Sequence, residues 1–183
     1  QFDGWKNETG SGAANVKYSF SGMSARNNSN SDGDFSVYSG SGKNNLLFGS
    51  NAYFLIGGIA LTNETSYTLS FGTEMFDNDN KDAAFDPSQF HVYISADEQK
   101  WVELSYAFAK GVYQVGKWDL ASSTFTLPAG TASLSVYFCS DRASVHRIDD
   151  VKLMVSETAG TAIDFSTGTP IAGINPGTGD NPG

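Results

Sequence analysis

The clearest signal in the sequence is a repeated alternation of apolar and polar residues. A period of two places successive side chains on opposite faces of a β-strand, so that one face is buried and the other is exposed. Clusters of Gly, Asn, Asp and Ser, which are typical of turns, separate the alternating runs. The clearest runs are residues 16–20, 67–71, 90–94, 134–138 and 151–155. The pattern predicts about nine or ten short strands, and we therefore predict an all-β fold, a two-sheet antiparallel β-sandwich.

Residues 97–111 allow two interpretations. In the first, Asp97 is the N-cap of a helix that carries Trp101, Leu104 and Phe108 on one face. In the second, a turn at residues 97–99 leads into a strand that begins at Trp101. We favour the strand, because the preceding run is itself a strand and a short turn would complete a hairpin.

The composition changes near the C-terminus. Residues 167–183 consist mainly of Gly, Pro, Thr and Asn, from which no hydrophobic core can be built. We therefore predict a single β-sandwich domain over residues 1–156, followed by a transition and a linker over residues 157–183. A linker at this position leads us to expect a further domain in the full-length chain.

The charge of the chain narrows its possible partners. The 183 residues carry a formal net charge of −9, from 20 acidic and 11 basic side chains. This charge repels nucleic-acid phosphates, so we expect no nucleic-acid partner. The acidic residues serve solubility or hold a hard cation such as Ca²⁺. We expect no membrane-spanning segment, because the chain lacks an apolar run of about 18 residues.

Motifs for catalysis are weak or broken. Residues 111–118 match the first seven positions of a phosphate-binding loop, but Trp118 stands where a Mg²⁺-binding hydroxyl is needed. The acidic run 77–82 departs from the EF-hand pattern at Lys81 and Asp82. His91 and His146 are the only histidines and show no zinc-ligand spacing. We predict that the chain is not an enzyme, although a pair of glycosidase carboxylates depends on spatial separation and stays an alternative.

A few residues need an interpretation of their own. The single cysteine, Cys139, lies in a strand-like run and is predicted to be a small core or near-core residue. The tryptophans are Trp5, Trp101 and Trp118. Each tryptophan either fills core volume or stacks on the apolar C–H face of a sugar ring. Trp101 and Trp118 are the candidates for such a ligand-binding platform.

Several stretches carry a resemblance to a known group of domains. Residues 145–153 (VHRIDDVKL) resemble the closing strand of carbohydrate-binding-module-like jelly rolls. Residues 2–5 (FDGW) resemble the opening of the same folds. The middle of the chain resembles choice-of-anchor J and cleaved-adhesin domains, in residues 51–61, residues 66–71, and residues 90–97 followed by Trp101.

The resemblance implies a galactose-binding-like jelly roll with a structural Ca²⁺ that joins the first strand to the last. The implied ligands are Asp149 and Asp3. The residues agree in part, because Asp149 has the same parity as Val151 and Leu153 and should point inward. An inward carboxylate is costly unless it is paired or bound to a cation.

The resemblance also gives an expectation about function. It implies a non-catalytic accessory module of a secreted or cell-surface protein, of a kind common in the Bacteroidetes. Such a module binds a polysaccharide or glycan or aids cell adhesion. The alternative is a structural spacer that presents a neighbouring catalytic domain, and a more distant one is a glycoside hydrolase.

Overall fold

The computed structural model describes residues 16–26, 38, 44–75, 89–109, 117–141 and 146–173. These residues form ten β-strands, one 3₁₀ turn and no α-helix, which confirms the all-β prediction. Accordingly, the described part of the chain contains no helix that is long and apolar enough to cross a membrane. The strands are β1 (Lys17–Arg26), β2 (Asn45–Ala60), β3 (Ser66–Met75), β4 (Phe90–Ser95), β5 (Val102–Glu103), β6 (Ala107–Phe108), β7 (Asp119–Thr126), β8 (Ser133–Ser140), β9 (His146–Val155) and β10 (Thr161–Ala162).

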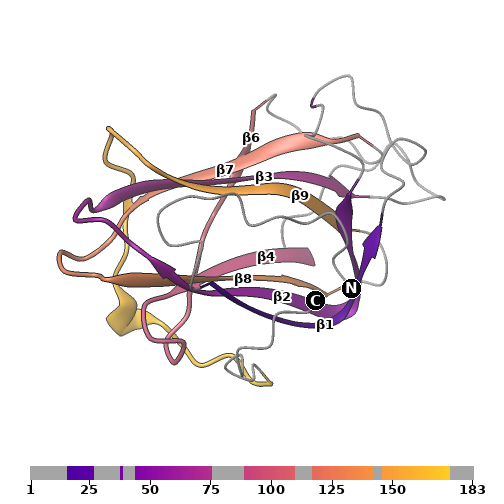
Figure 1. Cartoon of the computed structure of the whole chain (residues 1–183), viewed down its shortest axis with the longest axis horizontal. Helices are drawn as coiled ribbons and strands as arrows, with labels where there is room; N and C mark the ends of the chain where they lie inside the picture. The colour runs from indigo at the N-terminus through magenta and orange to yellow at the C-terminus, as the bar shows by residue number, and fades with distance from the viewer. Residues whose placement is uncertain are drawn as a thin grey trace.

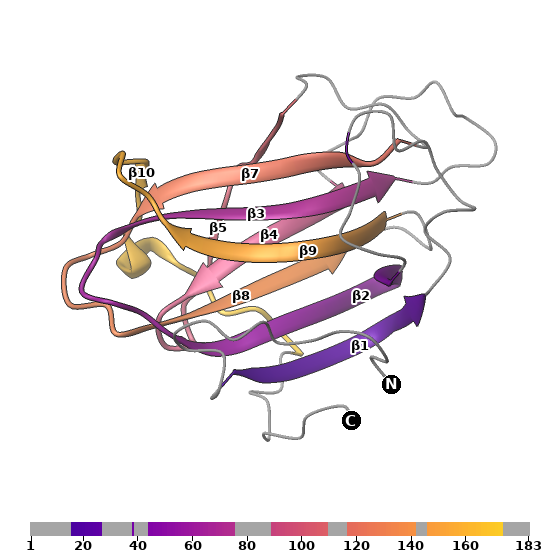
Figure 2. The same cartoon turned by 45° about the horizontal axis from the view of Figure 1, so that its top comes forward.

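The strands form a sandwich of two layers that are continuous with each other. The upper layer in Figure 1 has the order β10-β7-β3-β9, and the lower layer has the order β2-β8-β4-β5. Strand β2 joins the two layers, because its first part pairs with β9 at Leu46↔Ile148 and its second part pairs with β8 at Phe54↔Phe138. Strand β1 pairs with both parts of β2 (Figure 2). The sandwich prediction is confirmed, and the structure adds that one sheet folds over at β2.

Glycines allow the β1–β2 ribbon to bend where it passes between the layers. The register between the two strands shifts between Ser21 and Met23. Gly22, between these two residues, has a φ of 67°, which residues with a Cβ rarely adopt. A Cβ on Gly49 would lie 2.7 Å from the carbonyl oxygen of Gly22. The two backbones approach so closely that only glycine fits at this bend.

The core between the layers is mostly aromatic. The alternating runs 67–71, 90–94 and 134–138 place their apolar residues inside, as predicted, and Phe71, Phe90 and Phe138 are at most 1% exposed. The rings of Phe71 and Phe138 meet edge to face, with centroids 5.2 Å apart and planes at 78°. Such pairs add to the free energy of burial, because the positive edge of one ring meets the negative face of the other.

The side chains of β9 do not keep a single alternation. The register against β3 shifts so that Asp149 pairs with Gly72 and Lys152 with Ser70. Asp150 has a φ of 47° at this bulge. Ile148 is fully buried in the core, while Asp149 lies on the outward side of the sheet. The prediction that Asp149 shares a face with Val151 is therefore wrong, because the bulge changes the parity between them.

The segment after β4 follows the strand interpretation. Residues after Ser95 make a turn in which the Asp97 carboxylate accepts hydrogen bonds from the backbone N–H groups of Gln99 and Lys100, at 2.8 and 2.9 Å. Strand β5 then pairs with β4, with Tyr93 opposite Glu103. The chain continues through β6, which pairs with β7. The helix alternative for residues 97–111 does not hold for the described residues.

The domain continues past the predicted boundary at residue 156. Strand β10 pairs in parallel with β7, the one parallel pair among the described strands. Ile163 is 8% exposed and belongs to the main core, and Phe165 packs against it. Residues 161–165, which lie in the stretch that the sequence left as a transition, therefore pack against the sandwich. Two isolated apolar residues within a Gly- and Thr-rich stretch show no periodicity, so the sequence pattern did not reveal them.

We predict that Ile163→Ala lowers the free energy of unfolding by about 2–5 kcal/mol, because it removes buried methylene groups and leaves a cavity. Met154→Ala is the matched control, since Met154 is 53% exposed. Its effect should stay within about 0.5 kcal/mol. Urea unfolding of both variants measures the difference, and equal stability of the two would contradict the packing described for the C-terminal segment.

Candidate functional site

A row of aromatic side chains covers the outward side of the lower layer. Because Phe54, Val92 and Phe138 point into the core, their neighbours along the strands point outward. We call this surface the aromatic face. It consists of Tyr53 from β2, Tyr137 from β8, His91 and Tyr93 from β4, and Trp101 just before β5.

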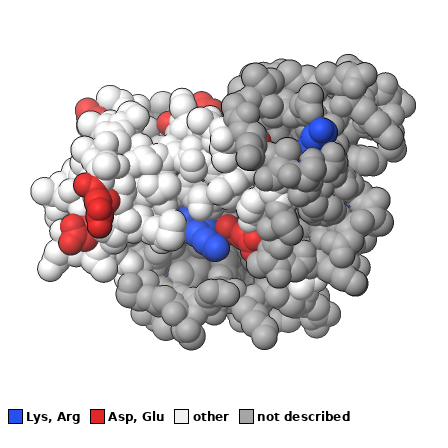
Figure 3. Space-filling model, turned by 90° about the horizontal axis from the view of Figure 1, so that it is seen from above, with Lys and Arg blue, Asp and Glu red and all other residues white. Residues whose placement is uncertain are grey.

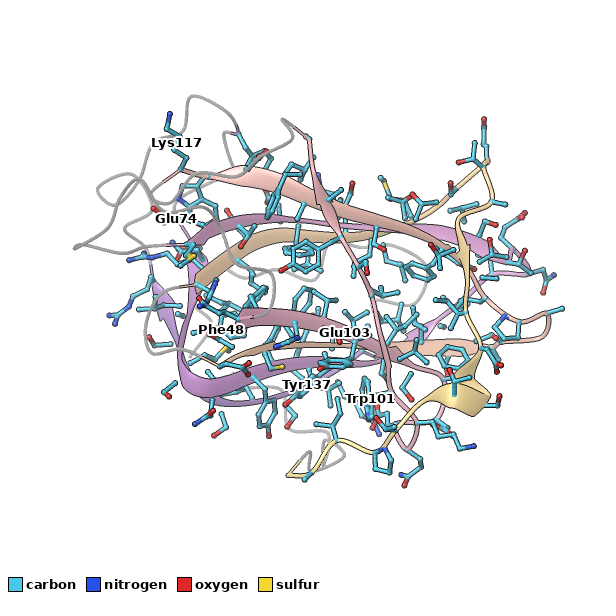
Figure 4. All side chains as sticks on the ribbon, turned by 180° about the vertical axis from the view of Figure 1, so that it is seen from behind. Phe48, Glu74, Trp101, Glu103, Lys117 and Tyr137 are labelled. Carbon is cyan, nitrogen blue, oxygen red and sulfur yellow. The ribbon has the colours of Figure 1, made fainter. Side chains whose placement is uncertain are left out.

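Tyr137 lies at the centre of the aromatic face. Its ring is stacked on Tyr53, with centroids 5.4 Å apart and planes at 25°. On the other side it contacts Tyr93 at 6.2 Å and Trp101 at 5.7 Å. Figure 4 shows Tyr137 and Trp101 on the underside of the lower layer. Tyr53 and Tyr93 are partly exposed, while Trp101 and Tyr137 are buried, so the two outer tyrosines offer the accessible ring surface.

Two carboxylates form one end of the aromatic face. His91 stacks on Tyr93 and lies between Glu103 and Asp141, with nitrogen–oxygen distances of 2.6 and 3.1 Å. The side chains of Glu103 and Asp141 are 54% and 61% exposed. Burial lowers the pKa of His91, but its hydrogen bonds to the two carboxylates and their negative charges outweigh burial, so the pKa is raised. The imidazole holds the two carboxylates in place as hydrogen-bond acceptors that face solvent.

Polar groups also form hydrogen bonds near the start of β8, two residues before Tyr137. Glu98, which has a φ of 58°, accepts a hydrogen bond from the hydroxyl of Ser135 at 2.8 Å. The same hydroxyl accepts a hydrogen bond from the backbone N–H of Gly58 at 3.1 Å. A Cβ on Gly57 would lie 2.7 Å from the Glu98 carboxylate, so glycine makes room for this side chain. The lower layer therefore carries rings flanked by hydrogen-bonding groups.

Among the described residues, the outward side of the upper layer carries no comparable row of rings. Its central strands carry small hydroxyl side chains there, and the hydroxyls of Thr68 and Thr124 lie 2.8 Å apart. Figure 3, which looks down on this side, shows few charged side chains on the described surface. Among the described residues, hydroxyl side chains thus lie at the middle of one outer side, next to Asp149 and the Glu74–Arg147 pair, and aromatic rings lie on the other. Within the row, Trp101 and Tyr137 are buried with Leu55 in a second apolar cluster, and Tyr53 and Tyr93 lie at its partly exposed margin.

The structure places both predicted platform tryptophans in the interior. Trp101 is 2% exposed and packs with Leu55 and Tyr137, and Trp118 is 1% exposed. A sugar ring needs an open indole face, and neither side chain offers one in this conformation. The core interpretation of both residues therefore fits the structure, and the platform interpretation does not. Trp5 lies outside the described residues.

The predicted metal ligand Asp149 lies in the upper layer, away from the aromatic face. Its carboxylate is 7% exposed and accepts a hydrogen bond from the backbone N–H of Asp150 at 2.8 Å. The pKa of Asp149 is raised to about 7, first because of burial and second because of the negative charge of Asp150. Asp150 in turn accepts a hydrogen bond from the Tyr38 hydroxyl at 2.6 Å.

This arrangement gives a partial fit to a calcium site. Two neighbouring carboxylates supply hard oxygen ligands, but Ca²⁺ takes 6–8 oxygens. The described residues contain no group of three His, Cys, Asp or Glu side chains that could hold a metal ion. Asp3 and the acidic run 77–82 lie outside the described residues. The calcium site therefore stays a prediction.

A buried ion pair joins Arg147, two residues before Asp149 on β9, to Glu74 on β3. Arg147 and Glu74 are opposite each other on β9 and β3, with Nε and Oε2 3.7 Å apart. Arg147 Nη1 also donates to Asn45 Oδ1 at 3.4 Å. The two ionic side chains are 6% and 0% exposed, so they are inaccessible to a dissolved ligand. The pair connects β9 to β3 and to the start of β2.

The remaining predicted residues have structural positions. Cys139 is partly buried beside the aromatic face, and burial raises the pKa of its thiol to about 12. This position agrees with the near-core prediction. His146 is fully buried, stacks on Phe90 and lies 3.1 Å from the hydroxyl of Ser140. Residues 111–116 of the phosphate-loop-like stretch lie outside the described residues.

Sequence reasoning missed the residues that form the aromatic face. Tyr53, Tyr93 and Tyr137 stand at the outward positions of strands whose inward positions were recognised. The available signal was the occurrence of tyrosine at positions where alternation called for a polar residue. The acidic partners Glu103 and Asp141 are far from His91 in sequence, and only strand pairing brings them together.

Comparison with known proteins gives no family assignment. No family model matches the sequence, and no curated protein matches it. The resemblance to choice-of-anchor J and cleaved-adhesin domains therefore stays a prediction.

Solved structures with a similar arrangement of strands have low sequence identity. TmCBM61 in complex with β-1,4-galactotriose is 12% identical, with a TM-score of 0.47 over 77% of this chain and 88% of that chain. The CBM22-1–GH10 modules of Clostridium thermocellum xylanase 10B with xylohexaose are 12% identical, with a TM-score of 0.48 over 77% of this chain. Tailspike protein 4 of bacteriophage CBA120 is 11% identical, with a TM-score of 0.46 over 78% of this chain. This chain spans 20% of the tailspike chain and 26% of the xylanase chain. None of these values is high enough to assign the chain to a family.

We predict a pH-dependent contribution of His91 to stability. A histidine whose pKa is higher in the folded state than its usual value of about 6.5 stabilises the fold fully below that value. The contribution is lost as the pH rises through the raised folded-state pKa. The free energy of unfolding should therefore differ most between wild type and His91→Gln near pH 5 and less near pH 9. These two pH values are chosen to lie roughly on either side of the pKa of histidine. A difference that stays constant over this range would show that the charge of His91 does not matter.

We predict that Ca²⁺ raises the melting temperature and that a chelator lowers it, because a cation bound only to the folded state stabilises that state. Asp149→Asn should remove both responses. Glu103→Gln is the control, since this exposed carboxylate lies in the other layer and should leave the responses intact. Thermal melts with and without EDTA provide the measurement. A wild-type melting curve that ignores calcium and EDTA would remove the site from consideration.

Proposed function

We propose that this chain is a non-catalytic glycan-binding module of a secreted or cell-surface protein, and that the aromatic face is its binding site. One observation carries the proposal. Tyr53, Tyr137 and Tyr93 form a row across three adjacent strands on an outward surface. The middle of the other layer differs, because hydroxyl side chains such as those of Thr68 and Thr124 meet there instead of rings.

The chemistry of the aromatic face suits a sugar chain. One side of a pyranose ring carries axial C–H groups and is apolar, so it packs against an aromatic ring. The sugar hydroxyls need hydrogen-bond acceptors and donors, which the carboxylates of Glu103 and Asp141 and the phenol groups supply. Burial and the charge of Glu103 raise the pKa of Tyr93 to about 12, so its phenol stays protonated and can donate a hydrogen bond.

The charge of the face narrows the class of glycan. Glu103 and Asp141 are both exposed beside the rings, and the chain carries a formal net charge of −9. Negative charge at this position repels uronic acids and sulfated sugars. We therefore expect neutral polysaccharides as ligands. Such polysaccharides occur in cell walls and extracellular material, which accords with a secreted or surface location.

We predict that Tyr93→Ala and Tyr53→Ala each weaken glycan binding by roughly tenfold, the effect of losing about 1.4 kcal/mol at a central aromatic contact. Met154→Ala, an exposed change on the other layer, should leave the affinity unchanged. Affinity gels with neutral glucans, xylans, galactans and mannans would find the ligand. Calorimetry with xylohexaose, β-1,4-galactotriose and matching oligosaccharides would then give the dissociation constants.

Melting temperatures of the same variants show whether a loss of binding reflects unfolding. If no glycan in the panel binds to wild type, the proposal fails and the spacer role is the better account. If binding occurs but Met154→Ala impairs it as much as the tyrosine variants do, the glycan binds elsewhere.

A further inference from the structure

The C-terminal segment lies against part of the aromatic face. We call residues 168–171 the strap. Thr169 forms two backbone hydrogen bonds with Trp101, in which Trp101 N–H donates to Thr169 O at 3.0 Å and Thr169 N–H donates to Trp101 O at 3.1 Å. Ile171 packs against the cluster of Leu55, Trp101 and Tyr137. Figure 1 shows this segment, in yellow, running beneath the lower layer.

The attachment of the strap is uneven along its length. Upstream, β10 and the buried Ile163 fix the chain to the body of the domain. A 3₁₀ turn over Phe165–Thr167, capped by the carboxylate of Asp164, then directs it toward the lower layer. Beyond the turn, the described residues of the strap are held by one bridge at Thr169 and by the partly buried side chain of Ile171, while Thr169 and Pro170 are exposed. The strap is therefore anchored at one end and weakly held along the rest.

Two residues of the strap determine how closely it approaches Trp101 and where its backbone pairing with Trp101 ends. Gly168 lies so near the lower layer that an added Cβ would be 3.0 Å from the backbone nitrogen of Trp101. Its φ of −64° and ψ of 152° suit any residue, so only the close approach requires glycine. Pro170 has no N–H group and cannot extend the ladder beyond Thr169. This geometry gives a contact that is specific in position but small in extent.

We propose that the strap and a glycan compete for the Trp101–Tyr137 part of the aromatic face, so that the strap regulates the binding site. This inference rests on the proposed function of that face. Release of the strap uncovers one side of Trp101 and extends the accessible row beyond Tyr53 and Tyr93. Trp101 then adds ring surface for a longer sugar chain, although it is buried when the strap is in place.

The competition has a simple thermodynamic form. In the open state the strap is released from the aromatic face. If only a fraction of the molecules is open, the apparent Kd of a ligand that binds this state equals its intrinsic Kd divided by that fraction. A change that weakens the strap without touching the aromatic face should therefore strengthen glycan binding. A bound glycan should in turn release the strap, because the coupling between two sites is reciprocal.

The test uses two substitutions that weaken the strap at different points. Gly168→Ala introduces a Cβ 3.0 Å from the backbone nitrogen of Trp101, so the strap and this backbone must move apart by a few tenths of an ångström. Ile171→Ala removes the apolar contact with the aromatic cluster. Ala172→Ser is the matched control, since Ala172 is an exposed neighbour in the same segment. Calorimetry with the tightest-binding oligosaccharide of at least six sugars should show roughly threefold to tenfold tighter binding for both strap variants, if the open state is a minor one. The control should bind as wild type does.

A second measurement follows the strap directly. Hydrogen exchange by NMR should show that added glycan speeds exchange at the amides of Trp101 and Thr169, which donate the two bridge hydrogen bonds. The amide of Leu104, which donates to Val92 O at 2.8 Å, should stay protected. Strap variants should show the faster exchange at Thr169 without glycan.

The outcomes separate the two proposals. If wild type binds a glycan but both strap variants bind it equally well or more weakly, competition is refuted and the glycan-binding function stands. Unchanged protection of Thr169 at saturating glycan would refute it as well. If wild type and both strap variants bind no glycan in the panel, the proposed function fails and the regulation falls with it.

Discussion

The structure depends on the pairing of β2 with two different partners. Its first part lies beside β9 and its second part beside β8, so the sheet must fold over between them. Folding over brings the apolar sides of both layers together and buries the aromatic core. It also decides which side of each strand becomes the outer surface. The candidate site exists because the outward residues of β2, β8 and β4 become neighbours on one face.

The two outer surfaces of the sandwich have different chemistry. Small hydroxyl residues cover the middle of the upper layer, where hydroxyl pairs such as Thr68 and Thr124 meet across the strands. Rings cover the lower layer, and exposed or partly exposed rings add little to folding stability relative to buried ones. On that side Trp101 and Tyr137 are buried with Leu55, and Tyr53 and Tyr93 are the partly exposed rings around them. The His91–Glu103–Asp141 group, at the end of the same row, adds charge-assisted hydrogen bonds in a fixed geometry.

The strap meets the aromatic face at the backbone of Trp101 and at the apolar cluster that Ile171 packs against. Trp101 belongs to the aromatic cluster by its side chain and to the strap by its backbone. A movement of the strap would therefore change the surroundings of this residue. The upstream part of the segment is held by the core at Ile163, which limits motion to the residues that follow. A segment attached by few contacts beside the proposed binding surface is the kind of element whose population a ligand shifts.

The sequence by itself determined the all-β class, most of the strands and the aromatic core, because the period-two pattern follows directly from strand geometry. It also indicated the turn at Asp97, where a carboxylate satisfies two backbone N–H groups. Only the tertiary structure decided the face of Asp149, because a bulge at Asp150 reverses the alternation along β9. The tertiary structure also decided the aromatic face and the strap, since both combine residues that are far apart in the chain. Pairing over such long separations leaves no local pattern in the sequence. Trp101 shows the distinction most clearly: its aromatic nature was evident from the sequence, but its burial is set by Tyr137, Leu55 and the strap around it.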